Sequence, residues 1–250
     1  MKALVLEKKL DLKLRDIDLP TQVGLDDVKI KMHTVGICGS DIHYYEHGKI
    51  GQWKVNEPMV LGHEGSGTVI DIGKNEKILK IGDRVCIEPQ VVSKKTKEYK
   101  LGIYNYDQKV KFWATPPIHG CLAPEVIFPG DMVFRLPDNI SYAEGAMVEP
   151  LAVGMQAVTK AQIKPGQIGL VMGCGPIGLV TGLAALAGGC SKVYIADILS
   201  EKLKICSHYS DLIPVNLSKE NLSEKIMNDT NGWGVDRFFE CSGAVKAYES

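Results

Sequence analysis

Three short polar segments carry the side chains that could do chemistry: Gly36-Ile-Cys-Gly-Ser-Asp-Ile-His43, Gly62-His63-Glu64 and Val148-Glu149-Pro150. Together they offer one thiolate, one imidazole and two carboxylates as metal ligands. This is the donor set of a catalytic zinc site, in which three protein ligands hold the metal and a fourth position stays open. Taken singly, Cys38 is more often a buried small side chain and His63-Glu64 a satisfied polar pair. Only the combination predicts a metal site.

A second chemical feature is the turn Gly173-Cys-Gly-Pro-Ile-Gly178, which follows an uncharged strand-like run and precedes an apolar helix-like run. The G-x-G-x-x-G spacing is weak evidence alone, but this context is the one that dinucleotide binding requires. Gly173 allows the tight turn, Gly175 lets the backbone approach a pyrophosphate, and Gly178 lets the helix pack on the strand. The amides of the helix N-terminus then face the phosphates. The residues predicted to bind the cofactor here are Gly173, Gly175, Pro176, Ile177 and Gly178.

The selectivity for the cofactor is predicted from Asp197, which ends the next strand-like run 19 positions after Gly178. A carboxylate at this place accepts hydrogen bonds from the adenosine ribose hydroxyls and repels a 2′-phosphate. The residues that follow, Ile198-Leu-Ser200, supply no arginine for such a phosphate, so NAD is favoured over NADP. The simpler alternative is that Asp197 only caps the next helix.

Composition limits the class of protein. The chain has 250 residues, of which 45% are hydrophobic and 24% charged, as in an ordinary globular protein. Its net charge is -1 and it has no basic stripe, which argues against nucleic acid and membrane surfaces as partners. The seven cysteines are odd in number and dispersed, which fits a reducing cytoplasm better than a disulfide scaffold.

One segment, residues 168–190, is uncharged and long enough to cross a bilayer. Gly173, Gly175 and Pro176 interrupt it early, and no aromatic belt flanks it. A buried strand, a turn and a helix explain the segment better, so the chain is predicted to be soluble.

The elements that must position the three polar segments fall into two sets. Up to about residue 150, short β-branched runs bounded by turn residues predict strands at 2–7, 27–35, 67–72 and 84–88. A capping-box pattern at Ser141-Tyr-Ala-Glu144 starts a helix just before Glu149.

After Leu151 strands and helices alternate, which is typical of a parallel, doubly wound sheet. The strands predicted there are 168–172, 192–197, 212–215 and 235–240, and the helices are 151–161, 177–187, 200–207 and 223–228. The predicted fold class is α/β, with a β-rich domain at 1–152 and a dinucleotide-binding domain at 153–250. Because only the first half of a doubly wound domain can be counted, the chain is expected to be a fragment.

The motifs, taken together, resemble those of a known family. Gly36-x-Cys-Gly-Ser-Asp41 and Gly62-His-Glu-x-x-Gly67, followed by the glycine turn, are similar to the zinc-dependent medium-chain alcohol dehydrogenases. The segments that look most like the polyol branch of that family, the sorbitol and xylitol dehydrogenases, are 36–44, 60–73, 114–117 and 148–153.

The resemblance implies a GroES-like catalytic domain followed by a Rossmann domain, and an enzyme that uses zinc and NAD. The implied reaction oxidises a secondary hydroxyl of xylitol or sorbitol to the ketose, D-xylulose or D-fructose. Another secondary-alcohol or threonine-type dehydrogenase, and a non-catalytic NAD-binding fragment, stay open as alternatives. The resemblance also implies a homo-oligomer, a tetramer in full-length members, located in the cytoplasm.

Carried over residue by residue, the resemblance implies that Cys38, His63 and Glu64 bind the catalytic zinc. Glu149 would either ligate the metal or hold a water at it, and both readings stay open. Asp41 is expected to orient the ligands, since metal-bound imidazoles usually need a second acceptor.

The proton of the substrate would leave through Ser40, His43 or a water held by Glu149. The residues implied to line the polyol pocket are Tyr44, Phe112 and Thr115. Many members of the family carry a second, structural zinc bound by four cysteines, whose positions here are Ser93, Thr96, Tyr99 and Asp107. No thiolate remains at these positions, so one zinc per chain is predicted, and the lobe around 91–106 is expected to be mobile.

Overall fold

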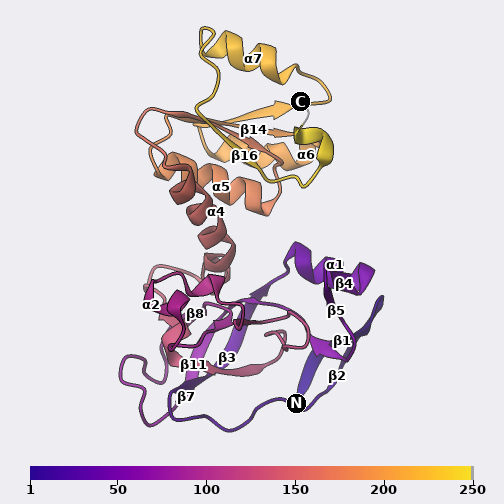
Figure 1. Ribbon diagram of the computed structural model, residues 1–250, viewed down its shortest axis with the longest axis vertical. Coiled ribbons are helices and arrows are strands. Elements are labelled where there is room, and N and C mark those ends of the chain that lie inside the picture. Colours follow the sequence, from indigo (N-terminus) through magenta and orange to yellow (C-terminus); the bar gives the residue numbers. More distant parts are fainter. Residues whose placement is uncertain (249–250) are drawn as a thin grey trace. The chain divides into compact units, whose positions relative to one another are not determined.

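The computed structural model describes residues 1–248, and Glu249 and Ser250 lie outside the described residues. It divides into two compact units, Met1–Glu149 and Pro150–Ser250. In Figure 1 the first unit runs from indigo to magenta and the second from orange to yellow. The boundary lies between Glu149 and Pro150, inside helix α4 (Val148–Ala161), and the boundary predicted after residue 152 falls in the same helix.

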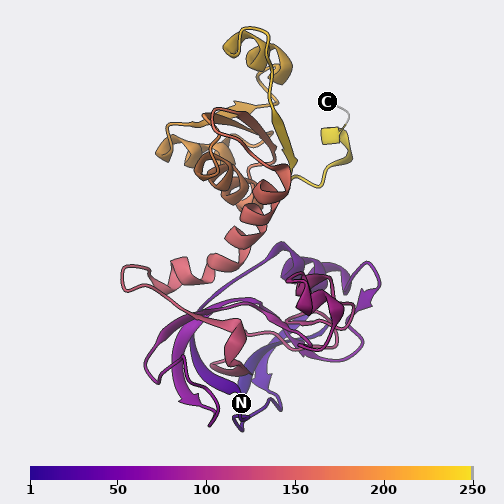
Figure 2. The ribbon, with the colours of Figure 1, turned by 60° about the vertical axis from the view of Figure 1, so that its left-hand side comes forward.

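The N-terminal unit is built on a five-stranded antiparallel sheet with the order β11-β3-β7-β8-β12. Its strands are β3 (Asp27–Gly36), β7 (Glu64–Ile72), β8 (Arg84–Ile87), β11 (Glu125–Pro129) and β12 (Val133–Arg135). Val28 and Ile30 of β3 are fully buried while Lys31 is exposed, the alternation of a strand with one face on a core. Figure 2 shows the strands of this unit as strongly curved ribbons.

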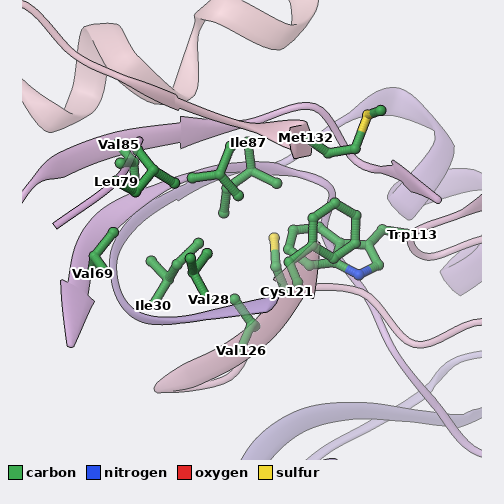
Figure 3. Close-up of a cluster of buried hydrophobic side chains, with 12 residues drawn as sticks. Val28, Ile30, Val69, Leu79, Val85, Ile87, Trp113, Cys121, Val126 and Met132 are labelled. Atoms are coloured by element: carbon green, nitrogen blue, oxygen red, sulfur yellow. The ribbon is translucent and has the colours of Figure 1, made fainter. Parts of the chain in front are cut away.

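A cluster of buried apolar side chains forms the core of this sheet. Figure 3 shows them pointing toward one another from β3, β7, β8 and β11. Val28, Ile30 and Val69 have no exposed surface, and burial of each such side chain is worth about 1.5–3 kcal/mol. Trp113 packs on Phe128 with ring centroids 4.3 Å apart. This core holds β3 against β7, and the ends of these two strands carry the first two polar segments.

Smaller elements surround the sheet. A three-stranded sheet has the order β2-β1-β6, from β2 (Asp11–Asp16), β1 (Lys2–Lys8) and β6 (Met59–Val60). Two short pairs are β4 (Lys49–Ile50) with β5 (Trp53–Lys54), and β9 (Gln90–Val91) with β10 (Lys111–Phe112). The helical segments are α1 (Gly39–His47), α2 (Lys97–Lys100), η1 (Tyr104–Tyr106), η2 (Gly130–Met132) and α3 (Tyr142–Ala146).

The capping box predicted from the sequence is present at the start of α3. The Ser141 hydroxyl accepts a hydrogen bond from the Glu144 amide at 3.2 Å, and a Glu144 carboxylate oxygen accepts one from the Ser141 amide at 2.7 Å. Two donors that the first turn would otherwise leave without partners are thereby satisfied. Helix α3 ends at Ala146, and α4 then starts at Val148.

The C-terminal unit contains a four-stranded parallel sheet with the order β15-β14-β13-β16. Its strands are β13 (Ile168–Met172), β14 (Lys192–Asp197), β15 (Leu212–Asn216) and β16 (Arg237–Glu240). The helical segments besides α4 are α5 (Pro176–Ala187), α6 (Ser200–Leu203), η3 (Lys204–His208), α7 (Leu222–Asp229) and η4 (Val245–Tyr248). Successive parallel strands must be joined by crossover connections, which are usually helices. The alternation of strand-like and helix-like runs in the sequence predicted these connections.

Both faces of the parallel sheet are covered. Val171 and Ile195 point into a cluster with apolar residues of α5, whereas Leu170 and Tyr194 point into a second cluster that includes Ile226 of α7. Neighbouring residues of one strand face opposite sides, so both side-chain sets must be apolar. This explains why the segment 168–190 carries no charge. Among the described residues, none of the helices combines the length and apolarity that a bilayer crossing needs.

Some expected elements differ from the structure. The helix expected at 200–207 is split into α6 and η3, because the chain tightens to 3-10 geometry after Leu203. Strands β2, β11 and β12 were not expected. The leucines of β2 are largely exposed, with Leu14 at 71%, so its pattern did not mark a buried face.

Candidate functional site

The pairing of β3 with β7 brings the first two polar segments together. Gly36, the last residue of β3, pairs with Glu64, the first residue of β7. A Cβ at Gly36 would overlap Oε2 of Glu64, so any larger residue would require that carboxylate to move. Two residues after Gly36, Cys38 caps the N-terminus of α1. The register of β3 and β7 therefore places the thiol of Cys38 beside His63 and Glu64.

Asp41 ties the two segments to each other. One carboxylate oxygen accepts a hydrogen bond from the Cys38 amide at 3.0 Å, and the other accepts one from the Gly62 amide at 2.9 Å. The Asp41 side chain is only 2% exposed, so its carboxylate is shielded from water. The sequence predicted that Asp41 orients the ligands, and the contacts support a role through the backbone of both ligand segments.

Three of the four predicted donors come together. Single ligand atoms of Cys38, His63 and Glu64 all lie within 4.8 Å of one another. His63 and Glu64 are buried, at 6% and 7% exposure, and Cys38 is half-buried. Burial raises the pKa of the Glu64 carboxyl, although the nearby His63 opposes that shift. Burial also raises the pKa of the Cys38 thiol, and a hydrogen bond from Ser40 opposes it.

The residues of this cluster fit a zinc ion. Within the described part of the chain, Nδ1 of His63 is buried and has no hydrogen-bond partner. Buried polar atoms almost always have a partner, so an unpartnered imidazole nitrogen next to a thiol and a carboxyl indicates an atom kept for a cation. A cation would also favour the charged forms of Cys38 and Glu64, which burial disfavours. Thiolate, imidazole and carboxylate are all common zinc ligands.

Glu149 lies in the first turn of α4 and is half-buried. Burial raises the pKa of its carboxyl; the neighbouring His63 lowers it and Glu64 raises it further. Glu149 therefore shares the electrostatic environment of the cluster. Its carboxylate is not among the mutually close donor atoms found in the described residues. Whether it ligates a metal or holds a water there remains a prediction.

A cavity of about 740 Å³ opens beside the cluster. His63 and Ser40 line it, and so do Tyr44, Phe112 and Thr115, the residues expected in the substrate pocket. The ring of Phe112 lies 5.4 Å from the ring of His63. The cavity thus combines hydroxyl groups and aromatic faces next to the donor atoms.

Of the two residues expected to carry a proton, Ser40 lines this cavity and is half-buried. His43 is exposed on α1, where its ring lies 5.6 Å from that of His47. Sequence reasoning did not assign a role to Asp107, Gln108, Trp53 or Trp113, which also line the cavity. Asp107 had been noted only as a position without a cysteine, and its burial could not be recognised from its polar neighbours.

The glycine turn has the geometry that its sequence predicts. Gly173 has φ 99°, a left-handed conformation that disfavours any side chain. A Cβ at Gly178 would overlap the carbonyl oxygen of Gly173, so helix α5 can approach β13 this closely only without one. At Gly175, the N-cap of α5, a Cβ would meet nothing within 4 Å, so the turn is open there.

Asp197 closes the same turn at the end of β14. Its two carboxylate oxygens accept hydrogen bonds from the amides of Cys174 and Leu199, each at 2.9 Å. A cavity of about 470 Å³ is lined by Asp197, Gly173 and Gly175. Lys202, which sequence reasoning did not consider, lines it too, with its Nζ 3.9 Å from Asp197.

Known proteins share these features. The sequence model of the alcohol dehydrogenase GroES-like domain matches residues 24–138. A protein of Agrobacterium fabrum, provisionally named a D-xylulose reductase, is 58% identical over 252 residues, covering 99% of this chain and 72% of that protein. The chain belongs to the zinc-dependent medium-chain alcohol dehydrogenases, in their polyol branch. The resemblance stated from the sequence and the α/β fold class are thereby confirmed.

Two further dehydrogenases are similar to this chain, one at a comparable sequence identity and one at a lower identity. The D-xylulose reductase of Morganella morganii is 56% identical over 245 residues, covering 98% of this chain and 72% of that protein. The crystal structure of 2R,3R-butanediol dehydrogenase from Bacillus subtilis superposes with a TM-score of 0.86 at 34% identity, covering 98% of this chain and 72% of that one. The chain therefore spans about 72% of the length of these relatives.

Proposed function

We propose that this dehydrogenase oxidises a secondary hydroxyl of xylitol to the ketone of D-xylulose, with zinc and NAD, and that sorbitol is a second substrate of the same site. The observation that carries the proposal is the cluster of Cys38, His63 and Glu64, with its unpartnered imidazole nitrogen, at the wall of a cavity lined by hydroxyl groups. The names of the two relatives at 58% and 56% identity support the choice of substrate.

The metal side of the reaction follows from the donor set. Cys38, His63 and Glu64 would hold the zinc, and one zinc per chain is part of the proposal. When bound, zinc supplies Lewis-acid chemistry that lowers the pKa of a hydroxyl. Asp41 keeps the two ligand segments at a fixed separation through its hydrogen bonds to Cys38 and Gly62. The carboxylate of Glu149 interacts electrostatically with His63 and Glu64 and adds a further acidic group beside them.

The proton of the hydroxyl leaves along α1. Ser40 lines the cavity, and its hydroxyl can accept one proton while it donates another. His43 lies three residues further on the same helix and is exposed, so its imidazole can pass the proton on to water. Phe112 and Tyr44 cover the cavity wall and exclude water from the reacting carbon.

The hydride acceptor is proposed to be NAD rather than NADP. The turn at Gly173 and Gly175 is open for a pyrophosphate, and the N-terminus of α5 offers its free amides there. Asp197 is 8% exposed at the edge of the cavity, where it can accept hydrogen bonds from ribose hydroxyls. Its negative charge disfavours a 2′-phosphate, and Lys202 offsets that charge only in part.

The proposal includes a cytoplasmic location and a homotetramer. All seven cysteines are free thiols, which fits a reducing compartment. The tetramer rests on family resemblance, and size-exclusion chromatography with light scattering tests it.

A second candidate is a dehydrogenase for small secondary diols. The similarity to 2R,3R-butanediol dehydrogenase, at 34% identity, favours it. Xylitol, sorbitol and 2,3-butanediol assayed side by side separate the two, because a polyol enzyme should have a higher kcat/KM for the longer, more hydroxylated substrates.

The experiment that tests the proposed function is xylitol-dependent reduction of NAD by the purified chain, with and without a chelator. We expect turnover that the chelator stops and that added zinc restores. Replacement of Cys38 by serine should lower both zinc content and turnover at least tenfold. Zinc-loaded protein that reduces no NAD with any polyol, or a C38S variant with near-normal zinc content and activity, would overturn the proposal.

A further inference from the structure

Asp107 is an ionisable side chain that the proposed reaction leaves unexplained. It lies between η1 and β10 and is only 5% exposed. Its Oδ1 accepts a hydrogen bond from the Lys109 amide at 2.9 Å, and its own amide donates to the Tyr104 carbonyl at 3.0 Å. Its Oδ2 is buried and has no hydrogen-bond partner within the described residues.

A carboxylate oxygen in this state costs free energy unless something binds it. Among the described residues Asp107 takes part in no ion pair, and the lysines nearest in sequence, Lys109 and Lys111, are exposed. A buried acceptor without a partner is rare and calls for a ligand, a water or an ion. Local loop geometry does not explain it, because Oδ1 alone satisfies the Lys109 amide.

A bound cation is not the best explanation. The other positions of the lobe that match the family's structural zinc ligands are Ser93, Thr96 and Tyr99, which are poor zinc ligands. In the part of the chain that the structure describes, the group of three close His, Cys, Asp or Glu donors is Cys38, His63 and Glu64, and Asp107 is not in it. A cation at Asp107 would have a single strong protein ligand.

The position of Asp107 points to the substrate instead. Asp107 lines the same cavity of about 740 Å³ as Ser40 and His63. Tyr44 and Thr115 add hydroxyl groups to its wall. A simple secondary alcohol has one hydroxyl, which the metal cluster would take. A polyol has further hydroxyls along its chain, and these are good donors to a carboxylate.

We propose that Asp107 is a specificity-determining residue whose Oδ2 accepts a hydrogen bond from a polyol hydroxyl other than the one oxidised. This inference rests on the proposed function, and it extends that function from the reacting carbon to the remainder of the substrate. Asp107 thereby favours polyhydroxylated substrates over alcohols that carry a single hydroxyl. Loss of one hydrogen bond to a charged acceptor predicts a decrease of about 10- to 100-fold in kcat/KM for the polyol.

The matched variants are Asp107→Asn and Asp107→Ala. Asparagine keeps a carbonyl oxygen for the Lys109 amide but places an NH₂ group where Oδ2 was, so it removes the free acceptor and keeps the loop contact. Alanine removes both. The exposed Asp138 supplies a control, Asp138→Asn, that makes the same chemical change away from the cavity. Melting temperatures of all variants report any loss of folding.

The experiment compares kcat and KM for xylitol with those for 2-butanol, and measures xylitol binding through the fluorescence of Trp53 and Trp113, which line the cavity. For D107N we expect a decrease of about 10- to 100-fold in kcat/KM for xylitol, mainly through KM, and a change below twofold for 2-butanol. Xylitol should bind correspondingly more weakly, and D138N should behave as wild type.

Three other results would each contradict the proposed role of Asp107, and they can be told apart. An unchanged xylitol KM and binding constant in D107N shows that Oδ2 does not contact the polyol. Equal losses on xylitol and 2-butanol, or losses confined to D107A together with a lower melting temperature, show a structural role only. A wild-type chain that neither oxidises nor binds any polyol overturns the proposed function itself, before the variants are compared.

Discussion

Replacement of Asp41 by alanine should both destabilise the N-terminal unit and weaken zinc binding. Asp41 is 2% exposed and accepts hydrogen bonds from the amides of Cys38 and Gly62. A hydrogen bond to a charged acceptor contributes about 1.5–3 kcal/mol, and its removal leaves a buried amide without a partner. Two such bonds predict that the free energy of unfolding falls by about 3–6 kcal/mol. For a chain of this size that corresponds to a melting temperature lower by about 6–24 °C.

The assay combines urea unfolding, followed by circular dichroism, with zinc content and zinc affinity by competition with a coloured chelator. Asp41→Asn should retain one of the two acceptor contacts and lose about half as much stability. Asp71→Ala is the control, because Asp71 is exposed and its carboxylate accepts a local hydrogen bond from the Ile72 amide. An Asp41→Ala variant within 1 kcal/mol of wild type, with normal zinc affinity, would refute the idea that this carboxylate holds the two ligand segments together.

Three further predictions follow from single contacts. Gly36→Ala should lower zinc affinity at least tenfold, since its Cβ displaces the Glu64 carboxylate, and unchanged affinity in the competition assay would contradict this. Asp197→Asn should reduce the preference for NAD over NADP at least tenfold, as measured by kcat/KM for both cofactors; an unchanged ratio would mean that the charge at this residue does not set the preference. The hydrogen bonds from Ser141 lower the pKa of Glu144, so their stabilising effect is present above the ordinary glutamate pKa and is lost as pH falls through the depressed value. In the Ser141→Ala variant the free energy of unfolding should therefore fall less than in wild type between about pH 5 and 3. If its pH profile runs parallel to that of wild type, the hydrogen bonds from Ser141 do not cause the pH dependence.

The parts of the fold that the sequence predicts well are those that a local pattern determines. Strands β13 and β14 have the predicted bounds, because both faces of a parallel strand are buried and the run must be apolar throughout. Strand β11 could not be recognised, since its five residues form a strand only by pairing with β3, whose sequence lies far away. The 3-10 segment after Leu203 depends on packing against β15 and has no local signal.

The candidate site, like the fold, could be predicted only where a local sequence pattern determines it. Residue types and the G-x-G-x-x-G context predicted which side chains carry the chemistry, and the resemblance to a known family assigned their roles. The closeness of Cys38 to His63 and Glu64 is a property of the β3–β7 pairing, which no spacing in the sequence reveals. The buried state of Asp107 was equally hidden, because its neighbours Gln108 and Lys109 are exposed and make the segment look like an ordinary loop.

Because Gly36 pairs with Glu64, metal binding depends on the correct pairing of β3 with β7 and can be used to measure it. In an unfolded chain Cys38 and His63 are separated by a long flexible segment, so a cation that needs both can bind tightly only after β3 and β7 have paired in register. Such a ligand stabilises the paired state by mass action, by about 2.7 kcal/mol when its free concentration is 100 times the dissociation constant. A register slip of one residue would move Glu64 to the opposite face of the sheet. Zinc uptake would then distinguish correctly paired molecules from mispaired ones, even in a preparation that shows the same strand content.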